Sequence, residues 1–189
     1  MTSPRTPPGR SARIRLAVIA LLAAGVTVAL YLAGRVHTVN PAASLFGQQY
    51  AAALALKALL ASVMLGLAAV QVLLALWMYR KLPLAGAPPR PVRWTHRAAG
   101  FALFTLSLPV AVHCLLAYGV QLTSVRVAVH SLAGCFFYGA FTAKVLLVQA
   151  RRLPRWLLPA AGGALAVAVA TLWYTSALWY YHGDQLPHF

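Results

Sequence analysis

The chain has 189 residues, of which 61% are hydrophobic and 9% are charged, and its mean hydropathy is +0.75. Soluble domains carry roughly 25% charged residues, so the composition excludes a soluble globular protein and indicates an integral membrane protein. Sixteen Lys and Arg residues stand against a single acid, Asp184. This lack of carboxylates excludes paired-carboxylate hydrolysis, carboxylate-bridged metal sites and proton relays of buried acids.

Five apolar runs are each long enough to cross a bilayer as a helix, which needs about 20 residues. We therefore predict an all-α integral membrane bundle with five transmembrane helices within residues 14–182. The spans are expected at about 14–34, 54–78, 98–119, 127–149 and 156–180. Residues 1–13 are predicted to be a disordered basic tail, and residues 183–189 a short tail at the other end. The first apolar run is too long for a cleavable signal peptide, which favours a retained helix.

The cations predict how the bundle is oriented. Most of them precede the first span or lie between spans two and three or four and five: Arg5, Arg10, Arg13, Arg15, Arg80, Lys81, Arg90, Arg93, Arg97, Arg151, Arg152 and Arg155. The opposite side has Arg35 and Arg126, while Lys57 and Lys144 lie near span ends, where they can snorkel. The positive-inside rule then predicts a multi-pass plasma-membrane protein with its N-terminus inside and its C-terminus outside. Topology accounts for these charges, so no nucleic-acid partner is expected.

Six histidines are unusual in so apolar a chain. The predicted topology puts His113 and His130 at similar depth near the outer ends of spans three and four, which a short connection makes antiparallel neighbours. His37 and His182 follow spans one and five on the same side, and His96 lies at the inner mouth of span three, about 25 Å from His113. An imidazole in a bilayer needs a partner and often marks a site. The pair predicts a shared haem iron, a bound metal ion or hydrogen bonds that link helices.

Zinc is the weaker of these choices, because its sites usually have four ligands and the two cysteines, Cys114 and Cys135, have no C-x-x-C spacing. These cysteines are expected to be small core residues, and a disulfide cannot be inferred from sequence. Without a C-x-x-C-H motif, any haem would be of the b type.

Glycines follow two of the histidines by one helical turn. The pairs are His96 with Gly100 and His130 with Gly134, each on one helix face. A glycine there removes the side chain that would block a flat porphyrin. Membrane helices also use glycine for close packing, so the pattern favours haem only modestly.

The segment from Ser124 to Val148, which contains His130-Ser131-Leu132-Ala133-Gly134, resembles the conserved His-Ser-x-x-Gly helix of the cytochrome b561 family. The preceding Trp94-Thr95-His96-Arg97 is similar to that family's inner-then-outer placement of haem ligands. The resemblance covers spans three and four, about a quarter of the chain. It implies b-type haem and transmembrane electron transfer. The chain departs from the family in that span two has no His and span five has one only at its outer end.

We expect a small b-type membrane cytochrome with one haem near the outer face. His113 and His130 are the expected iron ligands, with His182 as another partner for His130 and Arg126 as a partner for a propionate. Electrons would pass across or along the membrane to an outer partner protein or a quinone, as in a component of an oxidoreductase. A second haem, at His96, would lack a second His; Met78 is the available thioether.

The alternative is a non-catalytic scaffold or an anchor subunit of a larger complex, such as a quinone-linked one, with a soluble partner at the inner face. Its histidines would hydrogen-bond neighbouring helices rather than bind iron. Colour distinguishes the two hypotheses, because a scaffold purifies without a Soret band.

Overall fold

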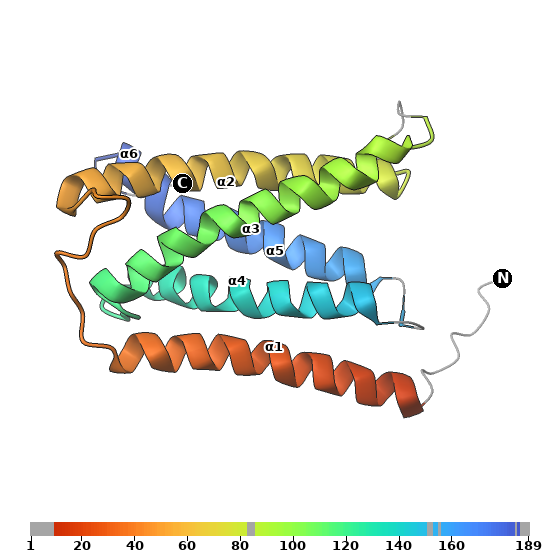
Figure 1. Cartoon of the computed structure of the whole chain (residues 1–189), viewed down its shortest axis with the longest axis horizontal. Coiled ribbons are helices and arrows are strands. Elements are labelled where there is room, and N and C mark those ends of the chain that lie inside the picture. Colours follow the sequence, from red (N-terminus) through yellow and green to blue (C-terminus); the bar gives the residue numbers. More distant parts are fainter. Residues whose placement is uncertain (1–9, 83–85, 151–152, 155, 184, 186–189) are drawn as a thin grey trace.

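The computed structural model describes residues 10–82, 86–150, 153–154, 156–183 and 185. In this part of the chain five long helical segments run alternately up and down (Figure 1). They are α1 (Arg10–Val36), α2 (Tyr50–Met78), α3 (Arg90–Tyr118), α4 (Val125–Gln149) and a fifth segment made of α5 (Leu157–Trp173), the π-helical turn η1 (Tyr174–Leu178) and α6 (Trp179–Tyr181). All five are long and apolar enough to cross a membrane. The structure therefore confirms the prediction of an all-helical chain with five helices long and apolar enough to span a membrane.

The helices extend beyond the predicted spans, mostly at their polar ends. α3 begins at Arg90 rather than near residue 98, with Pro91 in its first turn, where the missing backbone N–H costs no helical hydrogen bond. α1 begins at Arg10, inside the predicted disordered tail, just after Pro8 and Gly9. Residues 1–9 of that tail lie outside the described residues, as do 83–85 of the Pro-rich loop and most of 183–189.

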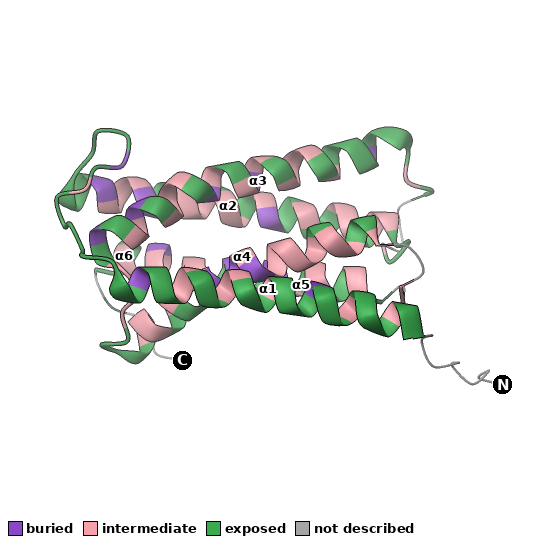
Figure 2. Ribbon diagram, turned by 60° about the horizontal axis from the view of Figure 1, so that its bottom comes forward, coloured by how far each residue is buried: buried purple, intermediate pink, exposed green. Residues whose placement is uncertain are grey.

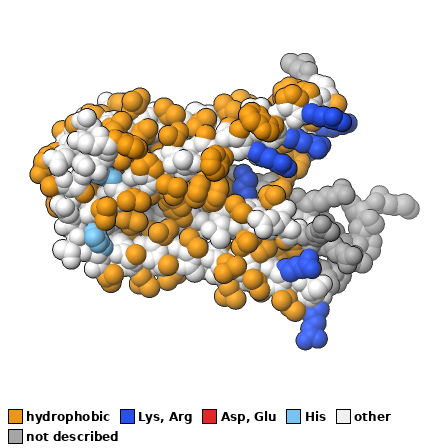
Figure 3. Space-filling model, in the orientation of Figure 1, with side chains coloured by type: hydrophobic (Ala, Val, Ile, Leu, Met, Phe, Trp, Pro, Cys, Tyr) orange, Lys and Arg blue, Asp and Glu red, His pale blue; other side chains and the backbone are white. Residues whose placement is uncertain are grey.

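The two ends of the bundle differ in charge, as Figure 3 shows. We call the end where α1, α3 and α5 begin the cationic end; its described cations include Arg10, Arg13, Arg15, Arg80, Lys81, Arg90, Arg93 and Arg97. The opposite end, which we call the histidine end, holds His37, His113, His130 and His182. Arg151, Arg152 and Arg155 of the predicted inner set lie outside the described residues.

The helices pack around the bundle in the order α1, α4, α5, α2, α3. α3 runs antiparallel to α4, as predicted, but it reaches α4 through aromatic side chains rather than by close backbone packing. Phe104 stacks on Phe141 with ring centroids 4.0 Å apart, and the Tyr138 hydroxyl donates to the carbonyl of Ser107 over 3.1 Å. This aromatic layer joins the core between α2, α4 and α5, where Phe137 is buried.

Helix α1 is attached at the side of the bundle. A Cβ at Gly139 of α4 would collide with the Thr27 hydroxyl and lie 2.6 Å from the carbonyl oxygen of Ala23, so glycine is required for this approach. At Gly34, a Cβ would come within 2.5 Å of the Val120 side chain. The outward face of α1 is exposed along its length (Figure 2). That face is apolar, which suits contact with lipid.

The connection 37–49 crosses the histidine end from α1 to α2 (Figure 1). The Asn40 N–H donates to the carbonyl of Leu116 near the end of α3 over 2.8 Å, and the Val120 N–H donates to the carbonyl of Gly34 over 2.8 Å. Leu45 is 3% exposed and anchors the connection. These contacts hold the backbone of residue 43 against α3, where it meets the candidate site.

The close approach of α1 to α4 makes a matched pair of glycine substitutions informative. Gly139→Ala is expected to destabilise the detergent-solubilised protein by about 1–3 kcal/mol, because the added methyl overpacks the contact with α1. Gly66→Ala in α2 has open space around it and should not lower the midpoint of thermal unfolding, because alanine is the better helix former. Equal midpoints for the two variants would contradict the α1–α4 contact.

Candidate functional site

Six side chains at the histidine end form two contacting groups, which together we call the histidine-end cluster. One group is Lys57 from α2 with His113 and Tyr118 from α3, and the other is Arg126 and His130 from α4 with Thr175 from η1. The described residues include no carboxylate, because the single acid of the chain, Asp184, lies outside them. Backbone carbonyls, hydroxyls and aromatic rings are therefore the partners of the cations and imidazoles in this part of the structure.

His113 is almost completely buried, at 4% exposure. Its Nε2 lies 3.0 Å from the carbonyl oxygen of Ala43 in the connection 37–49, so Nε2 carries the proton and donates it. A neutral imidazole has one donor and one acceptor, which leaves Nδ1 as a buried acceptor. Nδ1 has no hydrogen-bond partner among the described residues. Unsatisfied buried polar atoms are uncommon and need a physical reason, such as a water or a ligand.

Lys57 lies two helical turns inside α2 and is only 8% exposed. Its ammonium sits over the ring of Tyr118, 4.3 Å from the centroid, and that ring meets the ring of His113 edge-on at 6.1 Å. The prediction that Lys57 snorkels is therefore not met, since the side chain points into the bundle. A desolvated cation–π contact contributes about 2 kcal/mol, whereas burying an ammonium costs several kcal/mol. The Tyr118 ring alone does not offset this cost.

His130 is oriented by η1. Its Nδ1 lies 2.9 Å from the hydroxyl oxygen of Thr175, and that hydroxyl donates its own proton to the carbonyl of Thr171 over 2.7 Å. The hydroxyl oxygen must therefore accept from Nδ1–H of His130. This tautomer leaves Nε2 without a proton, as an acceptor or a metal ligand. Histidines that bind metals commonly donate from the other ring nitrogen in this way.

Arg126 lies one turn before His130 on the same face of α4 and meets the same turn of η1. Its Nη1 donates to the carbonyl of Thr175 over 2.8 Å, and its guanidinium lies over the ring of Trp179 at 3.8 Å. Thr175 thus receives two hydrogen bonds from α4, one on its carbonyl and one on its hydroxyl. π-helical turns often occur at functional sites, and this one fixes the directions of Arg126 and His130.

The predicted ligand pair, His113 and His130, lies at one end of the bundle but faces different segments. His113 contacts the connection 37–49 and His130 contacts η1. Lys57 lies on the His113 side, because the Tyr118 ring under its ammonium also meets the ring of His113. His182 follows α6 and is exposed, as is His37.

The two glycines predicted to open space for a porphyrin face side chains instead. A Cβ at Gly100 would lie 3.3 Å from the amide nitrogen of Gln71, and that amide donates to the carbonyl of His96. Gly134 faces Leu172 at 3.9 Å. Both positions are thus packed against α2 or α5, the common use of glycine in membrane helices.

The remaining candidates lie toward the cationic end or stand apart. His96 has a buried Nδ1 without a hydrogen-bond partner among the described residues. Met78 is the last residue of α2 and is half-buried. Cys114 and Cys135 are both free thiols. The described residues contain no group of three or more His, Cys, Asp or Glu that could hold a metal ion.

Sequence reasoning missed two members of the histidine-end cluster, Tyr118 and Thr175. Tyr118 carries no motif, and no sequence signal directs its ring toward Lys57, because the two residues belong to different helices. Thr175 sits in an aromatic run that predicts only an interfacial belt. Its role depends on the π-helical turn, which no pattern in the sequence indicates.

Comparison with known proteins gives a family but no activity. No curated protein and no solved structure matches the chain. A family model described as a family of unknown function (DUF6529) matches residues 16–188, a range that includes nearly all of the five membrane-spanning segments. The description names no cofactor, so the resemblance to cytochrome b561 stays a prediction. With a match over almost its whole length, the chain belongs to DUF6529, a family of unknown function.

Proposed function

We propose that the chain is a small b-type membrane cytochrome that binds one haem at the histidine end. The observation that carries the proposal is the buried ammonium of Lys57, which lies over the Tyr118 ring beside His113 and has no carboxylate near it among the described residues. A b-type haem has two carboxylates, an apolar ring and an iron that takes two nitrogen ligands. The haem carboxylates would pair with the cations of the histidine-end cluster, and the iron would bind its imidazoles.

The imidazoles differ in how ready they are to bind iron. Nδ1–H of His130 donates to the Thr175 hydroxyl, and Nε2 is unprotonated. Histidines that bind metals commonly have this arrangement. His113 has Nε2 on the carbonyl of Ala43, so binding through Nε2 requires its release from that carbonyl. Residues 100 and 134 are packed against side chains, so they contribute no space for the ring. The fit therefore rests on the imidazoles and the cations rather than on the glycines.

Lys57 and Arg126 are the cations suited to the haem propionates. A carboxylate beside the Lys57 ammonium would offset the cost of burying that charge. Arg126 donates to Thr175 and stacks on Trp179, which holds its guanidinium at the histidine end.

The haem would supply one-electron redox chemistry, and the chain would set its ligands, burial and surrounding charge. Among the described residues no second histidine lies toward the cationic end with His96, so one centre is proposed. It would exchange electrons with a redox protein at the histidine end or with a quinone in the membrane. The positive-inside rule puts the cationic end in the cytoplasm and the histidine end outside, in the plasma membrane.

A second candidate function is a non-catalytic scaffold or an anchor subunit of a larger complex. The observation that favours it is that the imidazoles already contact protein groups, His113 at Ala43 and His130 at Thr175. Hydrogen bonds of this kind link helices in membranes and contribute about 0.6–2 kcal/mol each.

A reduced-minus-oxidised visible spectrum separates the two candidates. Protein purified in mild detergent from haem-sufficient cells is expected to show a b-type spectrum, with about one haem per chain by pyridine haemochrome. His130→Ala should lose the haem, because the iron loses a ligand, while the five helices remain. A folded but colourless wild-type protein would leave the scaffold as the explanation.

His37→Ala is the matched control, since His37 is exposed in the connection beyond α1. Its spectrum should equal that of the wild type. Full haem content in both histidine variants would contradict the ligand assignment.

The charge of Lys57 predicts a shift in reduction potential. A nearby cation stabilises the reduced haem, which carries one more electron, so Lys57→Met should lower the potential by about 50 mV. Lys144→Met removes the same charge toward the cationic end and should change the potential far less. Redox titration of both variants measures this, and equal shifts would place the haem elsewhere.

Reporter fusions test the proposed orientation. Alkaline phosphatase fused after Phe189 should be active, because the positive-inside rule puts this terminus outside the cytoplasm. A fluorescent protein that matures only in the cytoplasm should be dark at the same position. The reverse pattern would invert the topology.

A further inference from the structure

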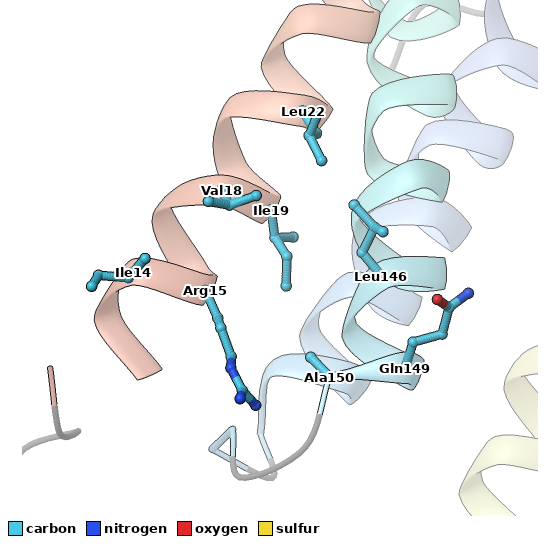
Figure 4. A pocket seen from close by; sticks show the side chains of 8 residues that line it. All are labelled: Ile14, Arg15, Val18, Ile19, Leu22, Leu146, Gln149 and Ala150. Carbon is cyan, nitrogen blue, oxygen red and sulfur yellow. The ribbon is translucent and has the colours of Figure 1, made fainter. Parts of the chain in front are cut away.

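An open groove lies between α1 and α4 at the cationic end, far from the histidine-end cluster. Figure 4 shows Ile19 and Leu22 of α1 and Leu146 of α4 along its apolar walls. Arg15 extends from α1 toward the end of α4, where Gln149 lies. The groove has a volume of about 490 Å³.

The groove follows from how α1 packs. The helices touch at Gly139, whose missing side chain admits Thr27 and the backbone of Ala23. From there α1 diverges from α4 toward its own N-terminus (Figure 1). The gap thus opens toward the cationic end of α1, a helix long and apolar enough to span a bilayer.

The chemistry of the groove changes along its length. Its deeper part is apolar, and its mouth has the guanidinium of Arg15; Arg13 and Arg10, two and five residues earlier on the same helix, lie outside the groove lining. An acyl chain suits the apolar walls and a phosphate suits the guanidinium, which forms paired hydrogen bonds with phosphate oxygens. Basic pockets between helices at a membrane surface commonly bind anionic headgroups.

We propose that this groove binds one anionic phospholipid from the leaflet at the cationic end. The acyl chain lies between α1 and α4, and the phosphate contacts Arg15 at the mouth. Charge argues against a second copy of the chain as the occupant, because two cationic ends would meet with no acid among the described residues to pair them. The proposal does not depend on haem binding.

The test compares lipid binding by the full chain in neutral detergent. Native mass spectrometry should detect bound phosphatidylglycerol in preference to phosphatidylcholine. Arg15→Gln should weaken phosphatidylglycerol binding about fivefold, the effect expected for one cation at an anionic headgroup. Leu146→Trp should abolish the bound lipid by filling the groove.

Two controls separate the groove from general surface charge. Arg13→Gln removes a charge from the same helix outside the groove lining, and Leu21→Trp adds a ring on the exposed face of α1. Both should retain wild-type binding. Equal losses for Arg13→Gln and Arg15→Gln, equal binding of the two lipids, or a dimer that dissociates in Leu146→Trp would each overturn the proposal.

Discussion

The handling of positive charge constrains the whole bundle, because the chain has sixteen Lys and Arg residues and one acid. Carboxylates, the usual partners of buried cations, are absent from the described residues. Most cations therefore lie at the cationic end. Lys57 and Arg126 instead use aromatic rings, and Arg126 also uses the carbonyl of Thr175. The Tyr118 ring carries no negative charge, so an anionic ligand beside Lys57 would offset the cost of burying its ammonium.

Two segments of irregular backbone supply hydrogen-bond partners that regular helices cannot supply. The connection 37–49 supplies the carbonyl of Ala43 to His113, and the π-helical turn supplies Thr175 to Arg126 and His130. In a membrane, backbone that leaves the α-helical pattern needs partners inside the protein. Both irregular segments lie at the histidine end, and both contact ionisable side chains there. The two irregular segments thus supply the hydrogen-bond partners of the histidine-end cluster.

The sequence predicts the helices better than it predicts the contacts of the site. Length and hydropathy locate five spans, but a hydropathy window misses the polar first turns of α3 from Arg90, which are helical all the same. The depth of His113 and His130 follows from the spacing along each helix. Their partners do not, because Ala43 and Thr175 are 70 and 45 residues away in sequence. The inward direction of Lys57 likewise depends on where Tyr118 of α3 lies.

The distance between the two ends limits what a single redox centre can do. His113 and His96 are about 25 Å apart along α3, and the other histidines that the structure describes all lie at the histidine end. A haem at the histidine end would therefore serve that face of the membrane or a carrier dissolved in it, rather than conduct electrons to the cationic end. The cationic end, with its arginines and its apolar groove, is suited instead to contact with lipid. Electron exchange and lipid contact would then occupy opposite ends of one bundle, each set by the residues that gather there.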